Sequence, residues 1–311
     1  MRRAVIALAM LGVASACTCE PAHTPEVEVE VVDVPRDALP RARRGDLPAA
    51  TPMVTLEVRE DGFTVDNRAL IATWPERDRA RLSDAEIHAE VPVASEALEV
   101  PALSEVMARA RRTEEARAEG GGTPIAYALR AAPEVSWRRV SQAMWSAGRE
   151  GWAEPRVVLL DGEREVVLAL PPSHRGRRAD VEREVAAALE ALGEGTPRRE
   201  GATRHAEVEP ASPSITITAT LDVQVTLRGE PLAPSCDAVS PSAPAIPARE
   251  RHVDVDALAR CLDAARATAT LAPDERALFA VAAAPSVQFG EITAVLETLA
   301  SRGEIAIRAT P

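Results

Sequence analysis

A short pattern of apolar and polar residues occurs twice in the chain. Residues 131–137 read AAPEVSW and residues 283–289 read AAPSVQF, 152 positions apart. In each copy apolar residues follow at spacings of three, four and seven, and a glycine comes after them. Such spacings place apolar side chains on one helix face, and glycine suits a left-handed residue at a helix end. The pattern therefore predicts two equivalent helices, marked by Trp137, Val140, Met144 and Gly151 and by Phe289, Ile292, Leu296 and Gly303.

A second pair of helices is predicted upstream, at residues 102–112 and 257–267. The two segments align at an offset of 155, and their apolar residues again form one helical stripe in each copy. Leu103, Val106, Met107 and Ala110 fall opposite Leu258, Cys261, Leu262 and Ala265.

Period-two alternation predicts strands around both helix pairs. Residues 53–70 form a hairpin about Asp61-Gly62, a favoured turn dipeptide, and residues 214–232 alternate similarly. Further strands are predicted before each repeated motif, at 124–130 and 277–282, and after each glycine, at 155–160 and 304–309. Each half then has the order β-β-α-β-α-β, which predicts an α+β fold with two helices on one face of a small mixed sheet. We interpret the halves as a duplication whose differences lie in loops.

The predicted domains are bounded by changes in composition. The first covers residues 53–193 and includes an extra hairpin at Asp161-Gly162 and a helix over 179–193, with a stripe of Val181, Val185, Leu189 and Leu192. A polar linker covers 194–213, and the second domain covers 214–311. The helix is expected to pack on the first domain; the alternative is that its apolar stripe binds a partner.

The N-terminus is typical of an exported protein. Two arginines precede an apolar run at 4–13, which is too short to span a bilayer, so residues 1–16 are interpreted as a signal peptide. Small residues directly before Cys17 resemble a bacterial lipobox, which implies lipidation of Cys17; the alternative is a secreted protein cut near the same place. Residues 17–52, rich in Pro and acidic residues, are expected to be an extended tether. Thr18, where some inner-membrane lipoproteins have Asp, favours the outer membrane.

Charge and composition exclude some functions. The formal net charge is −12 at pH 7, and the chain contains no lysine. This argues against nucleic-acid binding, which requires a basic surface, and against adhesion of the protein surface to an anionic bilayer. Membrane attachment is therefore expected through lipid alone.

The arrangement resembles the periplasmic domain of the ExbD/TolR biopolymer-transport family. The residues that carry the resemblance are Asp61-Gly62, 103–112, Ala131-Ala132, Trp137, Val140, Gly151 and 157–160 in the first copy, and 258–265, Ala283-Ala284, Phe289, Ile292, Gly303 and 305–307 in the second. The family's transmembrane helix is missing, and its Asp after the central strand is Ala132 or Ala284 here. The motor role does not transfer. The resemblance implies non-enzymatic binding of an envelope protein or peptidoglycan, pairing into a homodimer, and an accessory place beside a biopolymer-transport system.

Few residues point to chemistry. Cys236 and Cys261 are expected to form a disulfide in an oxidising compartment, with a buried, unpaired Cys261 as the alternative. The five histidines are scattered and interpreted as solvated, and Asp256 is expected to cap a helix rather than join Asp254 at a metal. Neither a catalytic residue nor a cofactor is predicted. Two other functions stay open, a receptor holding a small ligand between the domains and an extracytoplasmic enzyme that uses surface carboxylates.

Overall fold

The computed structural model describes residues 34–93, 96–117, 125–170, 213–227, 230–232, 246–267 and 277–307. Contacts divide the chain into two units, Met1–Val32 and Asp33–Pro311, and everything below concerns the second unit. The predicted signal peptide, the helix over 179–193 and nearly all of the linker lie outside the described residues.

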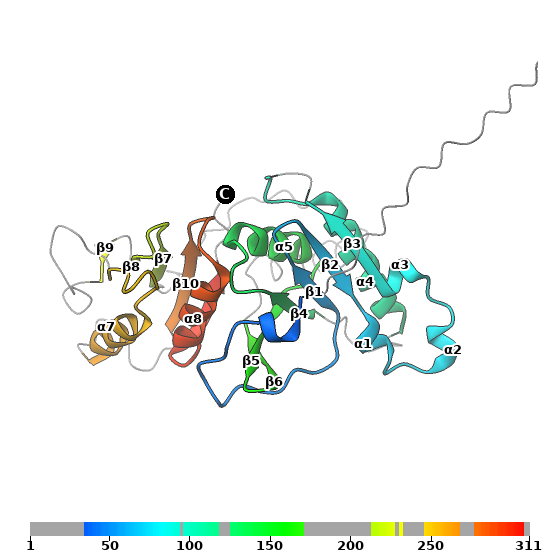
Figure 1. The fold of residues 1–311 in the computed structure, drawn as a ribbon, viewed down its shortest axis with the longest axis horizontal. Coiled ribbons are helices and arrows are strands. Elements are labelled where there is room, and N and C mark those ends of the chain that lie inside the picture. Colours follow the sequence, from blue (N-terminus) through cyan, green and yellow to red (C-terminus); the bar gives the residue numbers. More distant parts are fainter. Residues whose placement is uncertain are drawn as a thin grey trace, which may run out of the picture. The chain divides into compact units, whose positions relative to one another are not determined.

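The first half contains a mixed sheet of six strands in the order β3-β2-β1-β4-β5-β6 (Figure 1). Its strands are β1 (Thr55–Val58), β2 (Gly62–Asp66), β3 (His88–Pro92), β4 (Ala126–Ala131), β5 (Glu154–Asp161) and β6 (Arg164–Ala169). Strand β4 lies parallel to both β1 and β5, whereas β2, β3 and β6 pair with their neighbours antiparallel. The long helices are α4 (Pro101–Arg117) and α5 (Trp137–Arg149).

The second half contains a five-stranded sheet in the order β11-β10-β7-β8-β9. Its strands are β7 (Ser214–Ile217), β8 (Val223–Leu227), β9 (Glu230–Pro231), β10 (Ala277–Ala283) and β11 (Gly303–Ile307), and its helices are α7 (Val255–Ala267) and α8 (Phe289–Ala300). Strand β10 is parallel to β7 and β11, as β4 is to β1 and β5. Apart from β6, the two sheets therefore have the same order and the same strand directions, and the predicted α+β class is confirmed.

Both repeated motifs lie at the same position in their sheets. In the first half Val58 of β1 pairs with Ala131, the last residue of β4. In the second half Ile217 of β7 pairs with Ala283, the last residue of β10. In each case the chain turns after the central strand and enters a helix, α5 at Trp137 or α8 at Phe289.

Buried aromatic residues fill the space between each sheet and its helices. Trp137, Trp152 and Tyr127 are almost fully buried in the first half, as are Phe279 and Phe289 in the second. The rings of Tyr127 and Trp152 meet edge to face, with centroids 6.4 Å apart. The indole N–H of Trp152 donates to the Met107 carbonyl at 3.0 Å, which fixes the end of α5 against α4. With few aromatic residues in the chain, these rings provide a large share of the apolar contact.

The predicted extra hairpin is confirmed as β5 and β6, which pair from Asp161↔Arg164 to Arg156↔Ala169. Gly151 has φ +86°, the left-handed geometry predicted for a helix end. The same prediction is wrong for Gly303, which is the first residue of β11, because α8 ends at Ala300. Three short helices between β2 and β3 were not predicted, namely α1 (Arg68–Ile71), α2 (Glu76–Arg79) and α3 (Asp84–Ile87). Their apolar residues are too few to produce a helical period.

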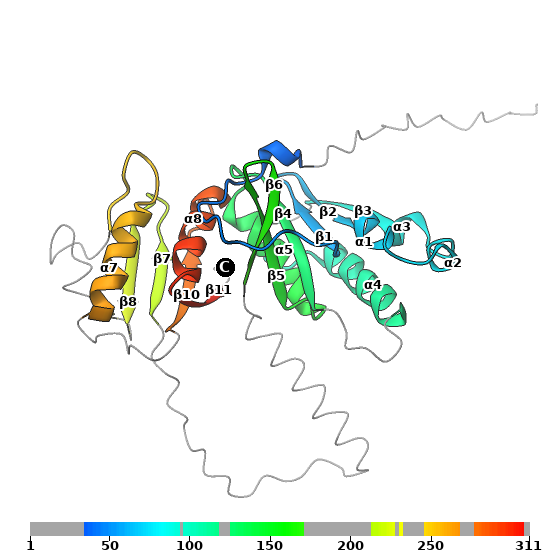
Figure 2. The ribbon, with the colours of Figure 1, turned by 90° about the horizontal axis from the view of Figure 1, so that it is seen from below.

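The prediction that residues 17–52 form a tether is wrong for the described part, residues 34–52. Val34, Leu39 and Leu47 are buried, and the first two pack with Val158 and Leu160 on the sheet face opposite the helices. Figure 2 shows this segment in blue, passing from β6 toward α8 and back to β1. The proline and charge content suggested an extended chain, but the isolated leucines among these residues are what bind it to the sheet.

Candidate functional site

The two repeated motifs contact each other. The Trp137 N–H donates to the Val287 carbonyl at 2.7 Å, and the Phe289 N–H donates to the Val135 carbonyl at 2.8 Å. Replacing each residue of the first bond by its equivalent 152 positions away in the other half, 137 by 289 and 287 by 135, gives the second bond, so the two bonds are equivalent and reciprocal. Such reciprocity is the property of an isologous interface, in which residue i meets j and j meets i.

A second reciprocal pair flanks the first. The Arg138 N–H donates to Pro285 at 3.0 Å, and the Gly290 N–H donates to Pro133 at 2.9 Å. Residues 133–138 and 285–290, which we call the junction, thus share four backbone hydrogen bonds. The first N–H groups of a helix have no partner within the helix, so each helix has its leading N–H groups satisfied by the other half.

The helix starts at the junction differ in how closely they approach the opposite loop. A Cβ added at Gly290 would lie 2.9 Å from the Cβ of Pro133. The equivalent position in the first half is Arg138, whose exposed side chain pairs with Glu96. Glycine at 290 is therefore needed for close approach on one side of an otherwise symmetric contact.

Carboxylates hold polar segments against both helix starts. Glu60 accepts bonds from the Ser136 N–H at 3.0 Å and the Ser136 hydroxyl at 2.9 Å. On α8, Glu291 accepts from the Val253 N–H at 2.8 Å and lies 2.7 Å from His252 Nδ1. Hydrogen bonding from Arg138 lowers the pKa of Glu96, which also contacts Arg139. These carboxylates position chain segments around the junction.

Residues 37–47, which we call the strap, link the first sheet to α8. Leu160 of β5 donates to the Pro40 carbonyl and accepts from the Ala42 N–H, both at 2.9 Å. Farther along, the N–H groups of Arg43 and Arg44 donate to Glu297 Oε2 at 2.8 and 3.1 Å. The strap thus has a backbone attachment to the first half and a side-chain attachment to the second.

Glu297 is 2% exposed on α8. Burial raises its pKa, and the two N–H donors and the charges of Arg43 and Arg44 oppose that rise. Its other oxygen, Oε1, is buried without a hydrogen-bond partner among the described residues. A buried carboxylate needs hydrogen-bond donors to offset its desolvation. Because only one of the two oxygens of Glu297 receives donors in the described part of the chain, its hydrogen bonding is only partly satisfied.

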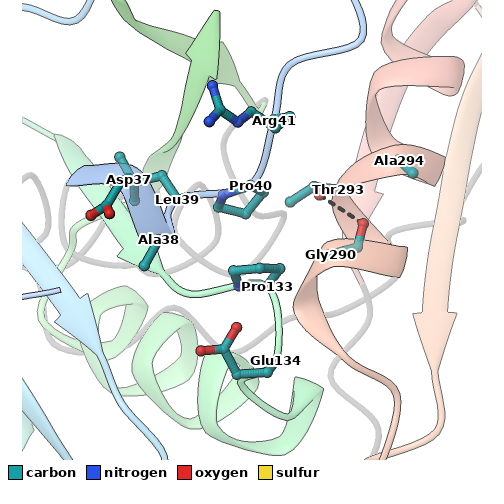
Figure 3. A pocket seen from close by; sticks show the side chains of 10 residues that line it. All are labelled: Asp37, Ala38, Leu39, Pro40, Arg41, Pro133, Glu134, Gly290, Thr293 and Ala294. Carbon is teal, nitrogen blue, oxygen red and sulfur yellow. Dashed lines mark hydrogen bonds between the residues drawn. The ribbon is translucent and has the colours of Figure 1, made fainter. Parts of the chain in front are cut away.

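A cavity of about 400 Å³ lies where the strap, the loop after β4 and the start of α8 meet. Its lining residues are Asp37, Ala38, Leu39, Pro40, Arg41, Pro133, Glu134, Gly290, Thr293 and Ala294. Figure 3 shows the charged ends of Asp37, Arg41 and Glu134 lying apart from one another around it. The Arg41 guanidinium donates to the Gly162 carbonyl at 3.0 Å, and the Thr293 hydroxyl donates to Gly290 at 2.9 Å.

The outer face of the first sheet carries a separate group of charges. Glu57, 6% exposed, lies 3.3 Å from Arg130, which also contacts Glu165 at 3.0 Å. The remaining Glu57 oxygen accepts from the Val34 N–H at 3.1 Å. This group fixes the start of the described chain to β1 and β4, so its role is structural.

The predicted site residues are only partly described. Cys17 and Cys236 lie outside the described residues. Cys261 is buried on α7 and is disulfide-bonded, so the alternative of an unpaired cysteine is wrong, while its pairing with Cys236 stays a prediction. The helix cap was assigned to the wrong residue, because Asp254 and not Asp256 accepts from the Ala257 N–H, at 2.8 Å.

The described residues contain no group of three or more His, Cys, Asp or Glu side chains that could hold a metal ion. Within the same ranges, no helix is both long and apolar enough to cross a membrane.

Sequence reasoning missed the junction and the strap. The repeated motif showed that residues 131–137 and 283–289 are equivalent in the two halves, but it did not indicate that they contact each other. Comparison of the chain with protein-family models, with curated proteins and with solved structures finds no match.

Proposed function

We propose that the protein is a lipoprotein of the bacterial envelope, held at a membrane by lipid on Cys17, that acts by binding and not by catalysis. The reciprocal hydrogen bonding at the junction carries the proposal. It supports a duplicated, ExbD/TolR-like unit whose two copies associate within one chain, as domains of that family associate between chains. The protein is then a scaffold that presents surfaces to other envelope components.

The proposed partner is an envelope protein or peptidoglycan, in an accessory place beside a biopolymer-transport system. Further pairing into a homodimer is part of the same proposal. An acidic chain favours protein or cell-wall contacts over nucleic acid or anionic lipid. Thr18 at the second mature position favours the outer membrane.

Capture by the lipid-free protein tests the binding proposal. Immobilised protein should retain an envelope protein from a detergent extract, or sediment with purified peptidoglycan. Recovery of neither would contradict it. Fatty-acid labelling of the wild type and of Cys17→Ser tests the anchor separately, and the label should be lost in the variant.

The cavity supports a second candidate function, a receptor for a small ligand. Its volume of about 400 Å³ falls in the range of ligand pockets, about 300–1,000 Å³. Such sites place a few polar groups so that they converge on the ligand, whereas Asp37, Arg41 and Glu134 lie apart here. A thermal-shift screen with small periplasmic solutes separates the candidates, because saturable stabilisation by one solute supports the receptor.

A further inference from the structure

A four-residue turn in the second half, which we call the basic turn, displays charged side chains without partners. It consists of Arg249, Glu250, Arg251 and His252, all of them exposed. The side chains of its two arginines and of Glu250 make no hydrogen bond or ion pair with any residue that the structure describes. In a chain with a formal net charge of −12, the turn is therefore a local site of available positive charge.

The backbone of the basic turn is strained. Glu250 has φ +54° and Arg251 has φ +66°. Arg249 and His252 exchange both backbone hydrogen bonds, at 2.8 and 2.9 Å, so the turn is a two-residue hairpin connection. Asn-Gly suits such a connection best, because φ is positive at both central residues and other side chains are strained there. Strain that a single substitution would relieve points to a use for the side chains that cause it.

The second half holds the basic turn at both ends. Before the turn, the Ala248 N–H donates at 3.0 Å to Asp222 Oδ1, in the connection between β7 and β8. After it, Glu291 of α8 accepts from the Val253 N–H at 2.8 Å and lies 2.7 Å from His252 Nδ1. Because the backbone is fixed in this way, little further ordering of the turn is needed for binding.

The chemistry of the basic turn favours a carboxylate partner of limited length. Guanidinium groups bind carboxylates through paired, charge-assisted hydrogen bonds, and Arg138 pairs with Glu96 in this way elsewhere in the chain. The acidic chain opposes the approach of an extended polyanion, and Asp222 and Asp254 lie just outside the turn. A short segment with a few carboxylates meets the arginines with little of that repulsion.

We propose that the basic turn is a docking point for a short acidic segment of a partner protein. Arg249 and Arg251 bind carboxylates of that segment, and the strained hairpin keeps both arginines exposed for it. The inference deepens the proposed binding function and rests on it for the existence of an envelope-protein partner.

Titration of the lipid-free protein with a blocked tetraglutamate peptide, followed by NMR shifts of the amides of residues 249–252, measures the docking. Arg251→Gly should raise the Kd of the peptide about fivefold, the upper end for an exposed ion pair. The same substitution should lower the equilibrium constant of unfolding in urea about fivefold, because glycine adopts a positive φ without strain. Binding and stability should thus change in opposite directions.

Glu250→Asn is the matched variant, because asparagine tolerates a positive φ and both arginines remain. It should stabilise the protein as Arg251→Gly does, yet bind the peptide at least as tightly as the wild type, since a negative charge is removed. Arg260→Ala removes an exposed arginine of α7, outside the turn, and should leave both peptide binding and stability unchanged.

The proposal is overturned if tetraglutamate does not shift the turn amides, if it binds Arg251→Gly as tightly as the wild type, or if tripolyphosphate binds the turn equally well. It is also overturned if Arg251→Gly is no more stable than the wild type. An envelope protein retained equally by the wild type and Arg251→Gly would contradict the docking point alone. Binding of tetraglutamate at the turn, with no envelope protein retained, would contradict the proposed function alone.

Discussion

Gly290→Ala tests the close approach of the two halves at the junction. The added Cβ would lie 2.9 Å from the Cβ of Pro133 and 3.4 Å from its carbonyl oxygen, so either α8 or the opposite loop must shift. Overpacking of this kind costs about 1–3 kcal/mol. Alanine also favours a helix over glycine by up to about 1 kcal/mol. The expected net result is a loss of stability of about 1–2 kcal/mol, measured by equilibrium unfolding in urea.

The matched control is Gly45→Ala, where an added Cβ meets nothing within 4 Å. That variant should be unchanged or more stable by up to about 1 kcal/mol, because alanine restricts the unfolded chain. If Gly290→Ala were also more stable than the wild type, α8 would have open space beside residue 290. The reasoning about the junction would then be refuted.

Three further predictions concern individual contacts. Gly151→Ala should lose about 1–3 kcal/mol in urea unfolding, because residue 151 has φ +86° and its Cβ would collide with the Arg111 guanidinium; a neutral result would contradict that geometry. Burial raises the pKa of Glu297, so the ionised carboxylate lowers the stability of the folded protein at neutral and higher pH. This loss disappears at low pH, where the carboxyl group is protonated. Glu297→Gln should therefore gain in melting temperature over the wild type near pH 8 and lose that gain as pH falls to 4, and a constant difference would disprove the shift. Peptide mapping without reduction should recover Cys236 joined to Cys261, and reduction should cost about 3 kcal/mol; recovery of either cysteine with another partner would refute the pairing.

The sequence predicted the repeated elements because their signals are local. Trp137, Val140 and Met144 lie within one helix, and the same is true of Phe289, Ile292 and Leu296. Turn chemistry at Asp161-Gly162 likewise predicted the extra hairpin. Each of these signals needs only neighbouring residues. The alignment of one copy with the other then predicted the same succession of helices and strands along both halves, whereas the order of the strands within each sheet came from the structure.

The contacts that join the halves could not be predicted in the same way. The junction is built from backbone N–H and carbonyl groups of residues 133–138 and 285–290, and backbone groups leave no pattern in a sequence. Nothing in the sequence showed that Gly290 is needed, because the residue it must approach closely, Pro133, is distant in the sequence. In the strap, Leu39 and Leu47 are isolated among polar residues, so the segment had the composition of a tether. Besides these leucines, backbone bonds to Leu160 and the contact with Glu297 hold the strap, and no local pattern indicates either of these long-range contacts.

Residue-resolved hydrogen exchange of the junction amides tests the central claim most directly, namely that two equivalent halves pair through their repeated motif. The amides of Trp137, Arg138, Phe289 and Gly290 should all be protected, and the equivalent residues Trp137 and Phe289 should become exposed together as urea is raised. Exchange at the rate of open turns, or protection of one motif without the other, would show that the halves do not pair there and would contradict the account.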